Sequence, residues 1–268
     1  MICAICGFSR NRLFRVKEMM FGFPEEFDYF ECGSCGCVQI AAVPDDLSRY
    51  YPDNYYSYNR IAGNEEPGFR SFCRSIRNNL KFFRESLICR STPVLRSPLF
   101  AIFKSQDLQL LFRTGITVDS SILDVGCGTG AYLSRLSAIG FKNLLGIDPY
   151  LKSDIRYKSG LRILKKTVHD LQDQFDLVML HHSLEHIPDQ LATLTACQRL
   201  LKSGGACLVR IPVADSYCYQ RYGKNWVNLD APRHLFLHTA KSLALISGKA
   251  GFRIREINYD SSDFSLWG

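Results

Sequence analysis

Two Cys-x-x-Cys pairs near the start of the chain have the spacing of a metal site. Cys3 and Cys6 form one pair, and Cys32 and Cys35 form the other. Each pair can turn a tight knuckle that directs two sulfurs to one point, and two knuckles supply the tetrahedral thiolate set that zinc prefers. Four protein ligands leave no open coordination position, so we expect a structural zinc site. Cys37 is a further thiol that could replace Cys35.

A glycine-rich segment, SSILDVGCGTG at residues 120–130, has the composition of a ligand-binding loop. Ile122, Leu123 and Val125 predict a buried parallel strand, and a helical pattern follows the glycines. This order exposes backbone N–H groups at a helix N-terminus, and glycine lets a ligand approach the backbone closely. Asp148 ends the next apolar segment about 20 residues later, where a carboxylate accepts hydrogen bonds from ribose hydroxyls.

The glycine pattern by itself fits two classes of ligand. Gly126, Gly128 and Ala131 also satisfy the dinucleotide fingerprint of nicotinamide dehydrogenases. Asp124, however, puts a carboxylate at the mouth of the loop, where it would repel a pyrophosphate and attract a cationic amine. S-adenosylmethionine carries an α-amino group and a sulfonium, so this loop favours it as the cofactor, with a dehydrogenase as the alternative.

Alternating strand and helix patterns predict the fold that must position these residues. Short apolar runs alternate with helical patterns after residue 116, which indicates a Rossmann-like α/β fold with a doubly wound, mostly parallel sheet. We divide the chain into a zinc-ribbon-like module (1–45), a tyrosine-rich linker with a basic amphipathic helical region (46–115), and a cofactor-binding domain (116–268). FRIREINYD, residues 252–260, reads as a further strand near the end of this domain.

The basic helical pattern runs from Phe69 to Leu87, with arginine and lysine opposite its apolar face. It could contact an anionic membrane surface or a phosphate-bearing substrate, but an ordinary docked helix with a solvated basic face is the favoured interpretation.

Composition describes an ordinary globular chain. Of its 268 residues, 46% are hydrophobic and 22% are charged. No apolar run reaches the roughly 18 residues of a membrane span, and the first residues do not form a signal peptide, so we expect a cytoplasmic protein. Its 11 cysteines should then be thiols or metal ligands. A formal charge of +7 permits an anionic partner without selecting one.

Several motifs together resemble the class I S-adenosylmethionine-dependent methyltransferases. LDVGCGTG followed by GID resembles motifs I and II of that family. FDLVMLHHSLEHIPD resembles its fourth-strand motif, and LLKSGGACLVRIP resembles the turn and fifth strand. The resemblance covers residues 116 to about 260 and implies the family's fold, activity and cofactor. That fold finishes with a sixth strand, which FRIREINYD would form, and a reversed seventh strand. Only SSDFSLWG follows, so the resemblance implies that the seventh strand is missing or that the domain is truncated.

The resemblance also implies roles for the matched positions. The glycine-rich loop would hold the methionine end of the cofactor, and the residues at the end of the second strand would bind its ribose. A later segment would contact the adenine, and a histidine would lie near the methyl group. In that order, the implied residues are Asp124, Gly126, Cys127, Gly128, Thr129 and Gly130; Asp148 and Pro149; Val168, His169 and Asp170; and His181.

His182, Glu185 and His186 follow the fourth-strand motif and are candidate catalytic residues. Glu185 and His186 resemble the LEH segment of the ubiquinone-pathway O-methyltransferases. A related ExxEH segment with a later histidine binds a divalent metal in the small-RNA 3′-end 2′-O-methyltransferases, but here His182 replaces the first glutamate of that pattern. Whether this segment binds a metal stays open, and a structural pair that caps the next helix is the alternative.

A second candidate segment, WVNLDAPRHLFLHT at residues 226–239, lies where this family carries substrate-binding insertions. His234 is the candidate general base, because imidazole titrates near working pH. Arg233 could hold a phosphate or carboxylate by a bidentate contact, and Trp226 is a candidate substrate contact. Loop packing is the alternative role for Arg233 and His234.

The order of modules narrows the expected acceptor. A four-cysteine module, a tyrosine-rich stretch and a methyltransferase domain together resemble sugar C-methyltransferases that act on nucleotide-linked deoxysugars, and bacterial methyltransferases associated with surface polysaccharides. We therefore expect a small-molecule or glycan acceptor, with carbon or oxygen methylation open. An RNA methyltransferase and a non-catalytic scaffold are the alternatives, and no aromatic RNA-stacking motif supports the former.

Overall fold

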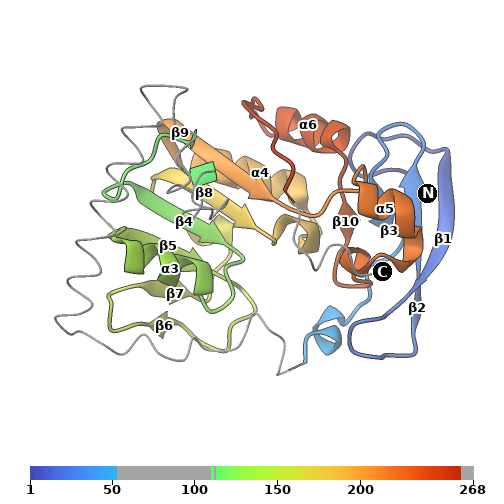
Figure 1. The fold of residues 1–268 in the computed structure, drawn as a ribbon, viewed down its shortest axis with the longest axis horizontal. Coiled ribbons are helices and arrows are strands. Elements are labelled where there is room, and N and C mark those ends of the chain that lie inside the picture. Colours follow the sequence, from blue (N-terminus) through green and yellow to red (C-terminus); the bar gives the residue numbers. More distant parts are fainter. Residues whose placement is uncertain (53–109, 112, 261–268) are drawn as a thin grey trace, which may run out of the picture. The chain divides into compact units, whose positions relative to one another are not determined.

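The computed structural model describes residues 1–52, 110–111 and 113–260. Contacts divide these residues into two compact units (Figure 1). We call residues 110–111, 113–179 and 200–208 the loop unit, and residues 1–52, 180–199 and 209–260 the cysteine unit.

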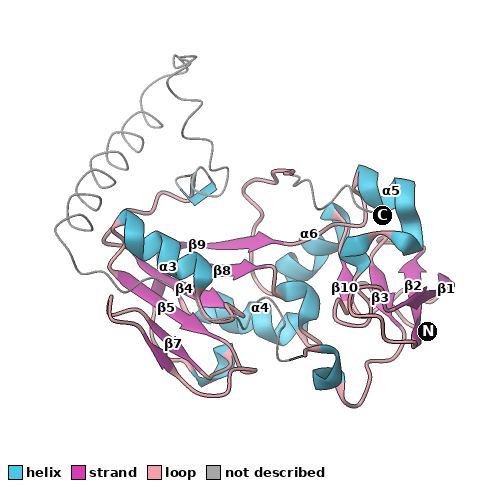
Figure 2. Ribbon diagram, turned by 60° about the horizontal axis from the view of Figure 1, so that its bottom comes forward, coloured by secondary structure: helices cyan, strands magenta, loops and turns pink. Residues whose placement is uncertain are grey.

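A six-stranded sheet forms the centre of the loop unit, in the order β6-β7-β5-β4-β8-β9 (Figure 1). Figure 2 shows β7, β5, β4, β8 and β9 from a second direction. Its strands are β4 (Ser121–Val125), β5 (Asn143–Ile147), β6 (Ile155–Arg156), β7 (Arg162–Leu164), β8 (Phe175–His181) and β9 (Leu201–Arg210). Strand β4 pairs in parallel with β5 and β8, and β5 pairs in parallel with β7, whereas β6 is antiparallel to β7. The predicted Rossmann-like, mostly parallel sheet is confirmed.

Helix α3 (Ala131–Ile139) packs on this sheet through apolar side chains at helical spacing. Gly130 and Gly140, both in the left-handed conformation, bound the helix. The buried core around it consists of Leu111, Ile116, Ile122, Leu133, Leu136, Phe141, Leu151, Leu161, Ile163, Leu177 and Met179.

A four-stranded antiparallel sheet in the order β1-β2-β3-β10 organises the cysteine unit. Its strands are β1 (Asn11–Lys17), β2 (Glu26–Cys32), β3 (Val38–Ile40) and β10 (Phe236–Leu237). Phe236 pairs with Gln39, so a segment from late in the chain completes the N-terminal sheet. The predicted domain boundaries after residues 45 and 115 stay a prediction.

The cysteine unit also contains helices α4 (Gln190–Arg199), α5 (Tyr217–Tyr222) and α6 (Ala240–Lys249). A capping box formed by Thr239 and Ser242 starts α6. Within the described ranges, no helix has the length and apolar character needed to cross a membrane.

Three sequence predictions concern further secondary structure: a strand at residues 252–260, a basic helix in the linker and a seventh strand. The strand predicted at residues 252–260 is wrong, because these residues form no strand in the described structure. A strand requires a hydrogen-bonded neighbour, and the sheet order adds none beyond β9. The basic helix predicted from Phe69 to Leu87 and the seventh-strand position after residue 260 lie outside the described residues.

Candidate functional site

The glycine-rich segment forms a tight loop between β4 and α3. Gly126, Gly128 and Gly130 have φ angles of 74°, 56° and 84°, which residues with a Cβ rarely adopt. A Cβ on Gly130 would also lie 2.5 Å from Ile163 Cδ1. The Gly126 N–H donates to the Ile147 carbonyl at 2.8 Å, so the loop closes over the ends of β4 and β5. Strand order reverses at β4, which is where open α/β sheets bind ligands.

Asp124, within β4, is a buried carboxylate with an unused acceptor. The residue is 2% exposed, and its Oδ1 has no hydrogen-bond partner among the described residues. Burial, with the charge of Asp148 second, raises the pKa of Asp124 to about 8. The sequence placed this carboxylate at the mouth of the loop, whereas the structure buries it. A cation bound beside Oδ1 would relieve the cost of burying it alone, and the α-amino group of S-adenosylmethionine is such a cation.

Asp148 follows β5 and braces the glycine loop. Its Oδ2 accepts a hydrogen bond from the Gly128 N–H at 2.9 Å, and its Oδ1 accepts one from the Tyr150 N–H at 2.9 Å. Burial raises the pKa of Asp148. Sequence analysis missed this bracing role. Each carboxylate oxygen of Asp148 keeps a second lone pair that could accept a hydrogen bond from a ribose hydroxyl. The ribose contact of Asp148 and Pro149 stays a prediction.

The predicted adenine-contacting residues form a single 3-10 turn, Val168–Asp170. Asp170 accepts hydrogen bonds from the Thr167 N–H at 2.8 Å and from its hydroxyl at 2.7 Å, while Val168 is buried. Asp170 is thus engaged in capping, and the roles of Val168, His169 and Asp170 toward adenine stay predictions.

The four predicted cysteine ligands meet in one cluster. The sulfurs of Cys3 and Cys35 are 3.6 Å apart, those of Cys6 and Cys32 are 3.5 Å apart, and all four lie within 4.8 Å of one another. Tetrahedral zinc with Zn–S bonds of about 2.3 Å separates its sulfurs by about 3.8 Å. Cys37 lies outside this group, so the suggestion that it could replace Cys35 is not supported.

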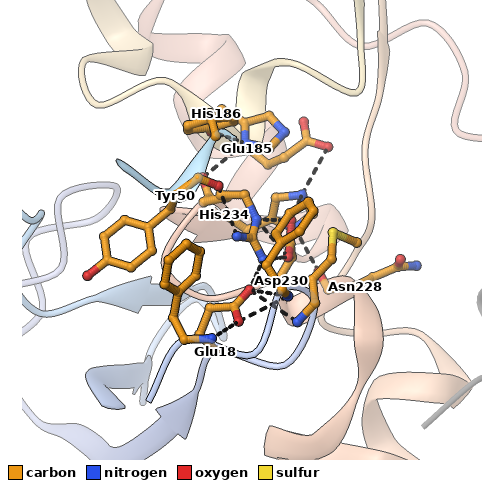
Figure 3. Close-up of polar contacts among 12 residues, drawn as sticks. Glu18, Tyr50, Glu185, His186, Asn228, Asp230 and His234 are labelled. Atoms are coloured by element: carbon orange, nitrogen blue, oxygen red, sulfur yellow. Dashed lines mark hydrogen bonds and ion pairs between the residues drawn. The ribbon is translucent and has the colours of Figure 1, made fainter. Parts of the chain in front are cut away.

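A polar cluster in the cysteine unit gathers Glu185, His186 and His234 (Figure 3). Glu185 is 1% exposed, and neither carboxylate oxygen has a hydrogen-bond partner among the described residues. Its Oε1 lies 4.0 Å from His234 Nε2 and 3.6 Å from His182 Nδ1, both too far for a hydrogen bond. The structure therefore brings the four candidate catalytic residues together.

The histidines His186 and His234 of this cluster are oriented through Nδ1. His186 Nδ1 lies 2.9 Å from the Arg233 carbonyl, and His234 Nδ1 lies 2.7 Å from the Asn228 carbonyl. A carbonyl oxygen only accepts, so each Nδ1 carries the proton and each neutral ring keeps its lone pair on Nε2.

Charge in this cluster is set by burial and by the neighbouring rings. Burial alone raises the pKa of Glu185, but His182, His186 and His234 outweigh it and lower the pKa to about 2. Burial and, second, His234 lower the pKa of His186 to about 4. Near neutral pH, an ionised carboxylate therefore faces a neutral imidazole. Such a cluster can accept a proton or bind a cation between its side chains. Whether it binds a metal ion stays open.

The structure corrects the predicted substrate roles of Arg233 and Trp226. The Arg233 guanidinium is fully buried and is bound by the carboxylates of Asp230 and Glu18 and by the Tyr50 carbonyl. It is therefore engaged within the protein and not presented to a substrate phosphate or carboxylate. Trp226 is 2% exposed and packs edge-to-face on Tyr219.

Sequence analysis missed Glu18 and Asp230, which hold Arg233. Asp230 lies three residues before Arg233, a spacing that could have suggested the pair. Glu18 follows β1, far away in the chain, and no sequence signal connects it to Arg233. His181 ends β8, where its Nε2 lies 3.1 Å from Arg210 Nη1, and its place beside the methyl group stays a prediction.

Comparison with known proteins agrees with the loop geometry. The family described as a methyltransferase domain matches residues 97–257. A ubiquinone biosynthesis O-methyltransferase of Pseudomonas aeruginosa (strain UCBPP-PA14) is 30% identical over 164 residues, which cover 54% of this chain and 69% of that protein. A protein with the same name from Pseudomonas putida (strain F1) is 33% identical over 95 residues, 31% of this chain and 40% of its own length.

Among solved structures, magnesium protoporphyrin IX methyltransferase from Synechocystis PCC 6803 aligns with a TM-score of 0.46 at 16% identity, over 73% of this chain and 94% of that one. Family membership rests on the domain match, which spans more than half of the chain, and on the Pseudomonas aeruginosa relative. The chain therefore belongs to the methyltransferase domain family and is a class I S-adenosylmethionine-dependent methyltransferase.

Proposed function

We propose that the chain transfers a methyl group from S-adenosylmethionine to a hydroxyl oxygen of a small molecule. The buried Asp124 carboxylate carries the cofactor part of this proposal, because its Oδ1 has no hydrogen-bond partner among the residues that the structure describes. The Pseudomonas relatives, named as O-methyltransferases, favour oxygen as the acceptor atom. As the more specific acceptor we propose a nucleotide-linked sugar or a polysaccharide precursor, which the order of modules in the sequence suggested.

The loop residues fit the cofactor in distinct ways. Asp124 would bind the α-amino group, and the positive-φ glycines let the methionine end approach the backbone. Asp148 would add ribose contacts while it braces Gly128. When bound, the cofactor supplies a methyl group on a sulfonium, an electrophile that needs an aligned nucleophile more than it needs activation.

His234 is the residue that we assign to proton transfer. Methyl transfer to a hydroxyl oxygen would form a carbon–oxygen bond, break the carbon–sulfur bond of the cofactor to give S-adenosylhomocysteine, and leave the hydroxyl proton to be removed. The Nε2 lone pair of His234 would take that proton, and the Glu185 carboxylate at 4.0 Å would stabilise the imidazolium.

The cysteine cluster would hold one structural zinc ion. N–H donors already point at its sulfurs: Gln39 Nε2 lies 2.8 Å from Cys3 Sγ, and the Ser34 N–H donates to Cys32 Sγ at 3.4 Å. Such donors favour thiolates, the form that binds metal.

Calorimetric titration with S-adenosylhomocysteine tests the cofactor, and a radiolabelled methyl assay with a panel of phenols, catechols and nucleotide-linked sugars tests the acceptor. We expect micromolar binding and label in an O-methyl ether. His234→Gln should lower turnover at least about 100-fold, the scale of lost general-base catalysis, while cofactor affinity stays unchanged. Label transfer only to carbon or to RNA, or no binding of S-adenosylhomocysteine, would overturn the proposal.

A further inference from the structure

The segment that carries His234 is held by residues of the N-terminal sheet region. Glu18 follows β1, and its fully buried carboxylate accepts hydrogen bonds from the N–H groups of Met20, Phe21 and Phe23. These three donors fix the carboxylate in its own loop. Its Oε1 also accepts a hydrogen bond from Arg233 Nη2 at 2.6 Å. The Glu18 carboxylate, which N-terminal residues hold in place, therefore binds the side chain of Arg233 from late in the sequence.

Arg233 transmits this constraint to Asp230. Its Nε donates to both Asp230 oxygens at 3.0 Å, its Nη1 donates to the Tyr50 carbonyl at 3.1 Å, and its guanidinium lies 4.9 Å from the centre of the Phe21 ring. A fully buried guanidinium is tolerated only when its charge and donors are matched. The ion triplet of Glu18, Arg233 and Asp230 therefore has little freedom to rearrange. Its member Asp230 also lies near His234, with Asp230 Oδ2 3.9 Å from His234 Nε2 (Figure 3).

The backbone around this triplet sets the orientation of His234. The Asp230 carbonyl accepts the His234 N–H at 3.1 Å, and the Tyr29 hydroxyl donates to the His234 carbonyl at 2.8 Å. With the backbone held on both sides, the ring can donate its Nδ1–H to the Asn228 carbonyl. Its Nε2 then lies between two carboxylates, 4.0 Å from Glu185 Oε1 and 3.9 Å from Asp230 Oδ2. The same segment orients His186, whose Nδ1 donates to the Arg233 carbonyl.

We propose that Glu18 and Tyr29 are positioning residues that keep His234 in the Nδ1–H tautomer with its Nε2 lone pair facing Glu185. The N-terminal sheet would then be part of the catalytic apparatus as well as a carrier of the cysteine cluster. Only the use of His234 as a base rests on the proposed function. The tautomer itself follows from the hydrogen bonds.

The test reads the tautomer directly. Long-range ¹H–¹⁵N correlation spectra of the full chain with ¹⁵N-labelled histidine distinguish Nδ1–H from Nε2–H rings, and His234→Gln and His186→Gln assign the signals. We expect Nδ1–H signals for both rings in the wild type. In Glu18→Gln and in Tyr29→Phe the His234 signal should shift toward the Nε2–H tautomer. Glu31→Gln is the matched control, because this glutamate pairs with Arg12 at the surface of the same sheet.

Affinity for S-adenosylhomocysteine separates positioning from general damage. It should stay within about two-fold of the wild type in each variant, because the cofactor loop shares none of these contacts. A wild-type His234 tautomer in both folded variants, or an equal shift in Glu31→Gln, would overturn the proposal. If Glu18→Gln does not fold, Tyr29→Phe, which removes a single hydroxyl, decides the question. Absent methyl transfer with an intact tautomer would count against the proposed function instead.

Discussion

Asp124→Asn should stabilise the cofactor-free chain and abolish cofactor binding. Burial raises the pKa of Asp124 from 3.8 to about 8. The folded chain therefore holds this proton more tightly than the unfolded chain does, and stability is lost as pH rises from 3.8 to about 8. Asparagine is neutral at every pH, so the variant does not carry this penalty. It also lacks the charge that would bind the α-amino group.

The size of the stability difference between Asp124→Asn and the wild type follows from the pKa shift of Asp124. At pH 7 the penalty is about 4 kcal/mol, because each pKa unit between the reference value and pH 7 corresponds to about 1.4 kcal/mol. This figure is an upper bound, since a buried site relaxes when it ionises. A gain of only about 1 kcal/mol would still raise the Tm by about 2–4 °C in a chain of this size.

Thermal unfolding of both proteins between pH 5 and pH 8.5, with and without S-adenosylhomocysteine, measures the effect. The Tm difference should grow with pH and level off above about pH 8, and the ligand should raise the Tm of the wild type alone. Asp176→Asn is the matched control. Burial raises the pKa of Asp176, but Lys202 and Ser121 outweigh it and lower the pKa, so this variant should lose stability. An Asp124→Asn variant that is destabilised at pH 8, or that binds the ligand normally, would refute the reasoning.

Three further substitutions test other parts of the structure. Gly130→Ala should cost about 1–3 kcal/mol in urea unfolding, because alanine would adopt a φ of 84° and its Cβ would meet Ile163; an unchanged midpoint would contradict the loop geometry. Elemental analysis should find the proposed zinc ion at one per chain in Cys37→Ser and lost in Cys3→Ser, and equal zinc contents in the two variants would contradict the proposed zinc site. Arg233→Ala should cost about 3–5 kcal/mol, because it leaves two buried carboxylates unpaired, and a loss below about 1 kcal/mol would show that the ion triplet is not buried.

Local sequence patterns predicted much of the fold and of the cofactor loop. Apolar runs alternating with helical patterns indicated the parallel sheet, since strand and helix periodicities are local properties of the chain. The glycines after β4 indicated a ligand-binding loop for the same reason, and the structure gives Gly126, Gly128 and Gly130 positive φ angles. The spacing of Cys3, Cys6, Cys32 and Cys35 was likewise enough to predict that their sulfurs meet.

Contacts between distant segments decided what the sequence could not. Arg233 reads as a substrate ligand in isolation, but Glu18, 215 residues earlier, turns it into a buried structural cation. The strand predicted at residues 252–260 has strand-like composition, yet strands form only where a neighbour supplies hydrogen bonds. Tautomer, burial and pKa are set by what surrounds a side chain, so the chemistry of Asp124 and His234 could be argued only once the tertiary structure had placed their neighbours.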